Sequence, residues 1–109
     1  MMPFEVFLTD DAARDLNELY EAIALLDSPY KADYVPGRIE KALSRLSKFP
    51  GRGAHPQELR ALGILEYREI FFKPYRIIYR VMGKNVYVLL IADGRRDMPS
   101  LLQRRLLDA

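Results

Sequence analysis

The sequence predicts an α+β fold, in which one strand and two paired helices precede a three-stranded antiparallel meander and a short C-terminal helix. Two observations carry this prediction. Apolar residues recur at steps of three and four in two segments of the first half, which is typical of helices that bury one face. Three later segments are rich in Ile, Val, Tyr and Phe and are separated by short turns, as in consecutive strands.

The first half of the chain supplies the first strand and the first helix. Residues 4–9, FEVFLT, alternate moderately between apolar and polar side chains, which fits a first strand. Thr9 or Asp10 is placed to cap the helix that follows. That helix is expected from residue 12 to about residue 27. Its apolar face consists of Leu16, Leu19, Tyr20, Ile23 and Leu26.

A second helix is expected within residues 29–49. Ser28 and Pro29 form a suitable cap and first turn. Pro36 interrupts the apolar stripe, which leaves two alternatives: a helix kinked at this point, or a helix that begins near it. Pro50 ends the helix, because the residue before a proline disfavours helical conformation. We expect the two helices to form an antiparallel hairpin.

The second half of the chain supplies the meander. Residues 50–65 contain glycine and proline at short intervals and are expected to form a loop. Strands are expected at residues 66–73, 75–82 and 86–93, joined by hairpin turns at Pro74 and at residues 83–85. The third strand is apolar on both faces, which favours a central position in the sheet. Residues 98–109 are expected to contain a short helix with Pro99 in its first turn.

Length and composition favour one domain, residues 1–109, with a packed core, because half of the residues are hydrophobic. The sequence has no cysteine, which excludes disulfides and thiol chemistry, and no apolar run long enough to span a membrane. With no signal-peptide pattern, these features predict a cytoplasmic protein. We expect no metal ion or other cofactor, because one histidine and acids on an exposed helix face cannot form a ligand shell.

Charged residues are unevenly distributed along the chain. Residues 1–35 hold eight acidic and two basic side chains, a net charge of −6, whereas residues 36–109 hold fifteen basic and seven acidic ones, a net charge of +8. Most of the basic residues are arginine, whose planar guanidinium suits phosphates and carboxylates better than the ammonium of lysine does. We therefore expect an anionic partner for the C-terminal two thirds of the chain.

Alternation along the expected strand 75–82 places Arg76 and Arg80 on the same face as Ile78. Burying unpaired guanidinium groups is costly, so we expect this face to be open to solvent or paired with acids, with Glu69 as the candidate partner. An open face would bind a target or nucleic acid. Its cations would be Arg68, Lys73, Arg76, Arg80, Arg95 and Arg96. The alternative is that these arginines only pair across strands and keep the sheet soluble.

The order of these segments resembles the RelE/ParE superfamily, the toxins of bacterial type II toxin–antitoxin modules. The resemblance covers nearly the whole chain and is carried by PYRIIYRV at residues 74–81 and by GRRDM at residues 94–98, which leads into LLQRRLL at residues 101–107. It implies that the first strand joins the meander in one sheet. RelE-like members cut messenger RNA on the ribosome, whereas ParE-like members are associated with poisoning DNA gyrase.

For the RelE-like branch, the resemblance implies catalytic roles for Arg76 and Arg96, which match an arginine of the middle strand and one after the last strand. The proton-transfer groups of that branch are not matched, since its C-terminal tyrosine should lie near Leu102. A nuclease would need other groups for general acid–base catalysis. The candidates are His55, Glu69 and Tyr87, each of which also has a purely structural explanation.

The unmatched proton-transfer groups, and a C-terminal segment similar to the ParE-like ending, favour the ParE-like branch. We therefore expect a toxin that arrests growth by binding and poisoning DNA gyrase and is neutralised by an antitoxin. Two alternatives stay open: a ribosome-dependent mRNA endoribonuclease, and a non-toxic basic binding module. The resemblance implies that DNA is contacted only through the antitoxin. The antitoxin is expected to contact Leu16, Leu19, Ile39, Leu43, Arg76 and Ile78.

Overall fold

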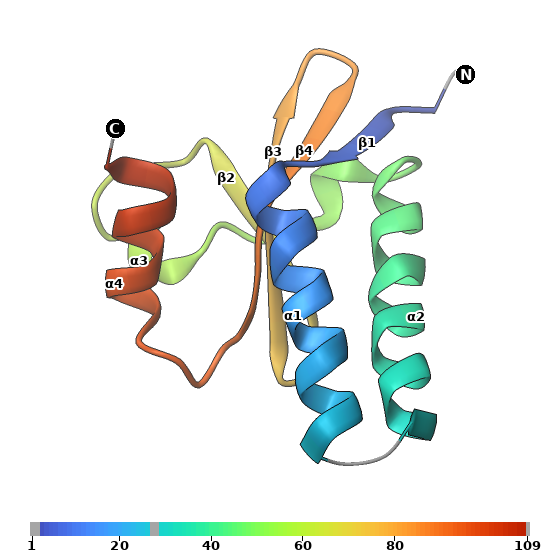
Figure 1. Ribbon diagram of the computed structural model, residues 1–109. Helices are drawn as coiled ribbons and strands as arrows, with labels where there is room; N and C mark the ends of the chain where they lie inside the picture. Colours follow the sequence, from blue (N-terminus) through green and yellow to red (C-terminus); the bar gives the residue numbers. More distant parts are fainter. Residues whose placement is uncertain (1–2, 27–28, 109) are drawn as a thin grey trace.

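The computed structural model describes residues 3–26 and 29–108 of the chain. Strand β1 (Glu5–Leu8) leads into helices α1 (Asp10–Leu26) and α2 (Pro29–Leu46), which lie side by side as an antiparallel pair (Figure 1). Two short helices follow, η1 (Pro50–Arg52) and α3 (Gln57–Arg60), and then strands β2 (Tyr67–Phe72), β3 (Tyr75–Met82) and β4 (Asn85–Asp93). Helix α4 (Met98–Leu102) continues as the π-helical segment η2 (Gln103–Leu107).

The four strands form one mixed sheet with the order β1-β4-β3-β2. Strands β2, β3 and β4 are an antiparallel meander, and β1 adds to β4 in parallel orientation, pairing residues 5–8 with residues 85–88. The β3–β4 turn is tight because Gly83 has a φ of 62°, a left-handed conformation that glycine adopts at little cost. The expected α+β fold, with the first strand in the same sheet as the meander, is confirmed.

The helix boundaries follow from local sequence signals. Helix α1 begins where Thr9 Oγ1 accepts a hydrogen bond from Ala12 N at 3.2 Å, so Thr9 serves as the cap. Helix α2 starts at Pro29, so the alternative of a helix that begins near Pro36 is wrong. Ser28, the expected cap of α2, lies outside the described residues. Residues 50–65, expected to be a loop, also contain the two short helices η1 and α3.

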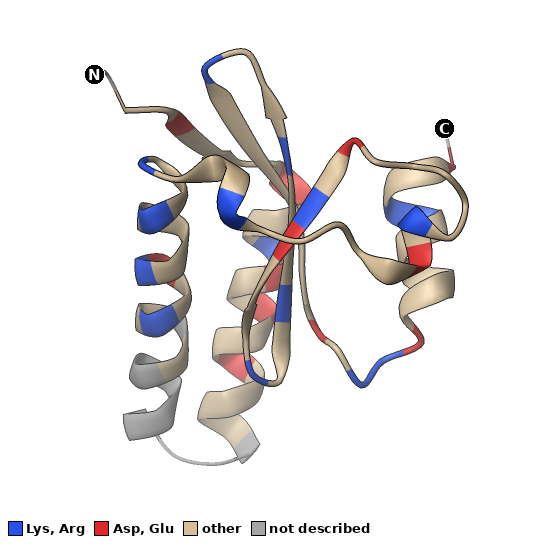
Figure 2. Ribbon diagram, turned by 180° about the vertical axis from the view of Figure 1, so that it is seen from behind, with Lys and Arg blue, Asp and Glu red and all other residues tan. Residues whose placement is uncertain are grey.

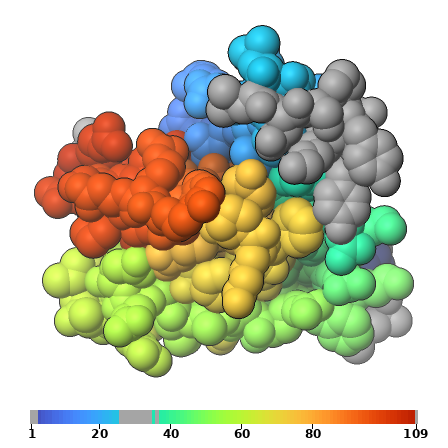
Figure 3. Space-filling model, turned by 90° about the horizontal axis from the view of Figure 1, so that it is seen from below, coloured from blue at the N-terminus to red at the C-terminus, as the bar shows by residue number. Residues whose placement is uncertain are grey.

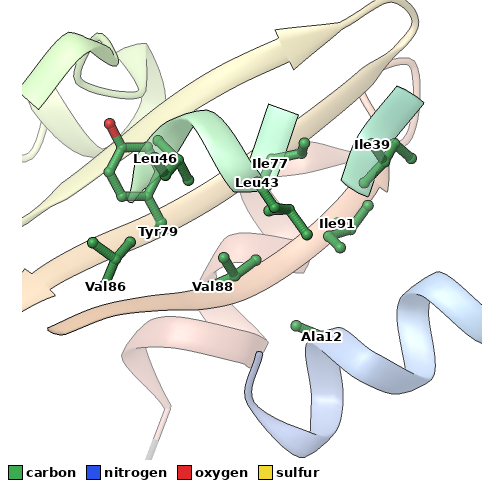
Figure 4. Packing of buried hydrophobic residues seen from close by; sticks show 9 residues of the cluster. All are labelled: Ala12, Ile39, Leu43, Leu46, Ile77, Tyr79, Val86, Val88 and Ile91. Atoms are coloured by element: carbon green, nitrogen blue, oxygen red, sulfur yellow. The ribbon is translucent and has the colours of Figure 1, made fainter. Parts of the chain in front are cut away.

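The helix pair covers one face of the sheet and forms the main core with it. Figure 4 shows the residues of this core: Ala12, Ile39, Leu43, Leu46, Ile77, Tyr79, Val86, Val88 and Ile91. Tyr79 is fully buried, and its hydroxyl donates to Pro50 O at 2.6 Å and accepts from Gly53 N at 3.1 Å. A Cβ at Gly53 would collide with this hydroxyl, so glycine lets the connecting segment close on the sheet.

The opposite face of the sheet is covered as well. Figure 1 shows α3 and α4 on the side of the sheet away from the helix pair. A second apolar cluster fills the space between them and the strands. It consists of Leu59, Tyr67, Ile78, Leu90, Ala92, Met98, Leu101 and Leu102. Of the two alternatives for this face, open to solvent or paired with acids, the open one is wrong, because apolar side chains of the C-terminal helix pack on it.

Within residues 3–26 and 29–108, no helix combines the length and the apolar character that crossing a membrane requires.

Candidate functional site

Arg76 of β3 is the centre of a buried ion cluster with two glutamates. Its Nε donates to Glu69 Oε1 of β2 at 2.6 Å, and its Nη1 and Nη2 donate to the two carboxylate oxygens of Glu58 in α3 at 2.7 and 2.8 Å. Arg76 and Glu69 are buried, at 9% and 6% exposure. Such a bidentate, hydrogen-bonded geometry offsets the cost of removing the charges from water.

The cluster fixes the ionisation of its members. Hydrogen bonds from Arg76 hold the pKa of Glu58 below its ordinary value of 4.5, although partial burial opposes the shift. The hydrogen bonds that Arg76 donates to Glu58, and the one that it donates to Glu69, raise the pKa of Arg76 above its ordinary value. Arg76 is thus a structural cation with its donors engaged by carboxylates. The prediction that it lies open to hold a phosphate or an antitoxin is wrong in this structure, whereas its predicted pairing with Glu69 is confirmed.

Backbone closes over the aliphatic part of Arg76. Gly94 N donates to Pro74 O at 2.8 Å, which brings the end of β4 beside the β2–β3 turn. A Cβ at Gly94 would lie 2.9 Å from Arg76 Cδ, closer than real side chains approach one another. The glycine that precedes the two exposed arginines, Arg95 and Arg96, is therefore needed for this close approach.

The other expected target-binding cations do not form one wall. Tyr79 packs in the core on the helix side, and Arg68 is its register partner, so Arg68 faces the helix side. Its Nη1 donates to Gly53 O at 2.8 Å. Arg80 is on the other face, 3.5 Å from Glu66 and with its guanidinium 6.0 Å from the ring centre of Tyr67.

Lys73, Arg95 and Arg96 are exposed at the opposite end of the strands from the β3–β4 turn. Figure 3 looks at this end, where the β4–α4 loop in orange lies beside the β2–β3 turn in yellow. Arg95 is bound to Asp93 through contacts as short as 2.6 Å, and these hold the pKa of the Asp93 carboxyl below its ordinary value. Arg96 has no side-chain hydrogen bond or ion pair to another described residue.

A pocket of about 400 Å³ adjoins Arg95 and Arg96. Strand β1 pairs with β4 only as far as Val88, so the following part of the β4 edge faces α1 with no strand beside it. The pocket occupies this gap. Its lining residues are Asp15, Glu18, Leu19, Ala22 and Ile23 of α1, Tyr75 of β3, Ile91, Ala92 and Asp93 of β4, and the two loop arginines.

One wall of this pocket is stabilised by Asp15, which joins three elements. Asp15 Oδ2 accepts from Ile91 N at 3.0 Å, and the carboxylate also accepts from both Nη atoms of Arg105 in η2, at 3.0 and 2.9 Å. Arg105 Nη2 donates in turn to Leu89 O at 2.9 Å. Two side chains thus satisfy backbone groups of β4 that a neighbouring strand would otherwise bind.

The candidates for proton transfer have structural contacts. His55 Nδ1 donates to Tyr67 O at 3.1 Å, and the hydroxyl of Tyr87 accepts from Asn85 Nδ2 at 3.3 Å. Glu69 is the ion-pair partner of Arg76. In the part of the chain that the structure describes, no group of three or more histidine or acidic side chains is placed to hold a metal ion.

The residues expected to bind an antitoxin lie mostly in the interior. Ile39 and Ile78 are fully buried, and Leu43 is buried beside Ile39 in the main core. Leu16 and Leu19 are half-buried at the edge of that core. The predicted antitoxin-binding residues are therefore not an accessible surface, except for Leu16 and Leu19. The apolar face of the helices, to which most of them belong, packs on the sheet.

Solved structures of toxin–antitoxin complexes share this fold. The structure of the chromosomal ParDE system from P. aeruginosa has a chain that is 26% identical, with a TM-score of 0.70, covering 83% of this chain and 95% of that one. A chain of the RelBE2 toxin–antitoxin complex from Mycobacterium tuberculosis is also 26% identical, with a TM-score of 0.57, covering 84% of this chain and 98% of that one. Fold and sequence together define the class: a RelE/ParE superfamily toxin of a type II toxin–antitoxin system.

Sequence comparison narrows the class to one branch. The family model described as the ParE toxin of the type II toxin–antitoxin system parDE matches residues 6–98. Toxin ParE3 of Caulobacter vibrioides is 30% identical over 100 residues, which is 92% of this chain and 96% of that protein. The chain belongs to the ParE toxin family.

Proposed function

We propose that this ParE-family toxin arrests growth by binding and poisoning DNA gyrase and not by cutting RNA itself. The observation that carries the proposal is the ion cluster of Arg76, which occupies the position that the resemblance equates with a catalytic arginine of RelE-like toxins. A catalytic cation must be free to meet the negative charge that develops on the phosphate. Here the guanidinium already donates to Glu58 and Glu69.

The target contact that fits this structure best is the exposed β4–α4 loop. Arg95 is held in place by Asp93, and the neighbouring Arg96, whose guanidinium pairs with no other described residue, lies beside the pocket. Arginine beside a concave, partly apolar surface is typical of the residues that dominate binding energy in protein interfaces. Poisoning by surface contact needs no general acid or base from this chain.

The antitoxin would neutralise the toxin by covering the same place. The solved relatives in the ParDE and RelBE2 systems belong to toxin–antitoxin pairs, which supports an antitoxin partner for this chain. A segment with leucines and acids fits the pocket, since Leu19 and Ile23 offer apolar contact and Arg96 offers a free cation. Bound there, the segment would block access of the target to the loop.

Inducible expression in bacteria tests the target. Gyrase poisoning should induce the DNA-damage response and filamentation while translation continues, and the purified toxin should inhibit supercoiling by gyrase. The variant Arg96→Glu should lose both effects, because it reverses the free cation at the proposed contact. Arg60→Glu, a charge reversal at an exposed residue of α3, is the matched control and should stay toxic.

Two results would overturn the proposal. Immediate translation arrest with codon-phased cuts in messenger RNA would assign the protein to the ribosome-dependent endoribonucleases. Arrest by Arg96→Glu as strong as that of the wild type, at equal protein levels, would remove the β4–α4 loop from the target contact.

A further inference from the structure

Four basic residues of α2 and the turn after it form a row along one side of the molecule. Arg38, Lys41 and Arg45 follow one another at steps of three and four residues, which places them on one face of α2, and Lys48 follows in the turn after the helix. All four are exposed. Figure 2 shows basic segments recurring along α2, whereas the acidic segments of the helix pair are mainly on α1. We call these four residues the basic row.

Acidic side chains of the described residues do not neutralise the basic row. Among the described residues, no carboxylate lies within ion-pair distance of these four side chains, whereas Arg76, Arg95 and Arg105 each contact one at 2.6–2.9 Å. Glu40 lies within the same stretch of α2, but it is offset from Lys41 by about 100° around the helix. Within the described part of the chain, the row is therefore a continuous line of positive charge that no carboxylate pairs with.

The spacing of the row fits a regular polyanion. Seven residues of helical rise separate Arg38 from Arg45, about 10 Å at about 1.5 Å per residue, and Lys48 in the turn beyond extends the row to about 15 Å. One strand of duplex DNA carries a phosphate about every 3.4 Å of helix axis, so about four phosphates span the same length. The row and one DNA strand thus carry a similar number of charges per length of axis. The guanidinium of Arg38 is also restrained by the ring of Phe72, 5.7 Å from its centre, which reduces the entropy lost on binding.

We propose that the basic row binds the phosphate backbone of double-stranded DNA directly, without reading its sequence. A flexible acidic peptide would offer carboxylates at no fixed repeat, whereas the duplex offers the regular spacing that the row matches. Figure 2 shows α2 and the β4–α4 loop at opposite sides of the molecule, so a toxin on DNA would keep the β4–α4 loop accessible. This DNA contact goes beyond the proposed function and does not depend on gyrase being the target.

The test is binding of the purified full-length toxin to a short labelled DNA duplex of mixed sequence, followed by fluorescence anisotropy at several salt concentrations. Four phosphate contacts predict a slope of about −3.6 for log K against log salt, and thus about a 150-fold loss of affinity from about 50 to about 200 mM salt. The variant Lys41→Gln/Arg45→Gln should give a slope of about −1.8 and about a 12-fold loss over the same range.

The matched control is Arg60→Gln/Arg104→Gln, which removes the same charge from exposed residues outside the row and should keep the slope of the wild type. Circular dichroism verifies that both variants fold. An equal reduction of the slope in both variants would overturn the proposal, because only net charge would then matter. No binding at the lowest salt would also overturn it. A further contrary result would be that polyglutamate displaces the labelled duplex as effectively as unlabelled DNA does at the same concentration of charge. That result would assign the row to an acidic peptide and would also overturn the proposal.

Discussion

A guanidinium group can be buried when its donors are satisfied, and Arg76 meets this condition through carboxylates from two different elements. Glu69 comes from the adjacent strand, whereas Glu58 comes from the short helix α3. Removing one member of such a cluster leaves a buried charge without its partner, which is much less favourable than replacing the whole cluster. The three side chains therefore act as one structural unit, and α3 is held to the sheet through it.

At this scale we predict that the contribution of Glu58 to stability depends on pH. Its pKa is lower in the folded protein than its ordinary value of 4.5, so its stabilising effect is fully present above that value and is lost as the pH falls through the folded pKa. Wild type should be more stable than Glu58→Gln at pH 7, and the difference should shrink as the pH falls below about 4.5. Urea unfolding at several pH values measures this.

Glu66→Gln is the control for that series, because Glu66 is exposed and its ion pair with Arg80, at 3.5 Å, is exposed as well. It should change the urea midpoint little at any pH, as exposed ion pairs contribute at most about 1 kcal/mol. A difference between wild type and Glu58→Gln that stays constant from neutral to acidic pH would contradict the assigned role of the carboxylate.

Sequence reasoning reached one half of the Arg76 cluster. Alternation along neighbouring strands identified Glu69 as a partner, because pairing across an antiparallel sheet is local and periodic. Glu58 was missed because it lies in a segment punctuated by glycine and proline, where no period indicates which way a side chain points. Pro56, two residues before Glu58, is compatible with the start of a short helix. Nothing in the sequence, however, places that helix over Arg76.

At the scale of elements, Asp15 joins α1, β4 and η2 at a place where the sheet has no strand. We predict that Asp15→Ala speeds hydrogen exchange of the Ile91 amide by about tenfold or more, because the variant removes the acceptor of that amide and the partner of Arg105. Native-state exchange followed by NMR measures the effect. Asp11→Ala is the control, since Asp11 is 3.7 Å from Arg105 and, among the described residues, makes no hydrogen bond or ion pair to β4. Equal protection of Ile91 in wild type and Asp15→Ala would show that the link does not hold the strand edge.

The strands and the C-terminal helix differ in how far the sequence predicts them. The predicted strand 75–82 coincides with β3, and the other strands differ by a residue or so at their ends, because β-branched and aromatic runs are bounded by clear turn residues. The existence of the C-terminal helix is also confirmed. Leu101 and Leu102 of this helix pack on the second face of the sheet. The sequence does not show which face receives them, because Arg76 and Arg80 on that face favour exposure to solvent or pairing with acids.

At the scale of the whole molecule, basic residues lie in three separate places, one buried and two at the surface. Arg76 is neutralised inside, Arg96 is free at the β4–α4 loop, and the basic row is free on α2. The charge asymmetry between the two parts of the sequence predicts a basic surface but not its location, since arginines occur in strands, helices and loops alike. Position, and not composition, distinguishes structural arginines from those available to a partner.

The central claim is that Arg76 supports the fold and takes no part in chemistry. A single Arg76 substitution cannot test it, because two carboxylates left unpaired would destabilise the protein by about 3–5 kcal/mol. The triple variant Arg76→Met/Glu58→Leu/Glu69→Leu replaces the guanidinium and both carboxylates by apolar side chains, which is often nearly neutral for folding.

The decisive measurement is growth arrest by this triple variant, at expression equal to wild type and with native circular dichroism. Our account predicts that the triple variant arrests growth as strongly as the wild type and remains neutralised by the antitoxin. A correctly folded triple variant that no longer arrests growth would contradict the account, because the guanidinium of Arg76 would then be needed for toxicity itself.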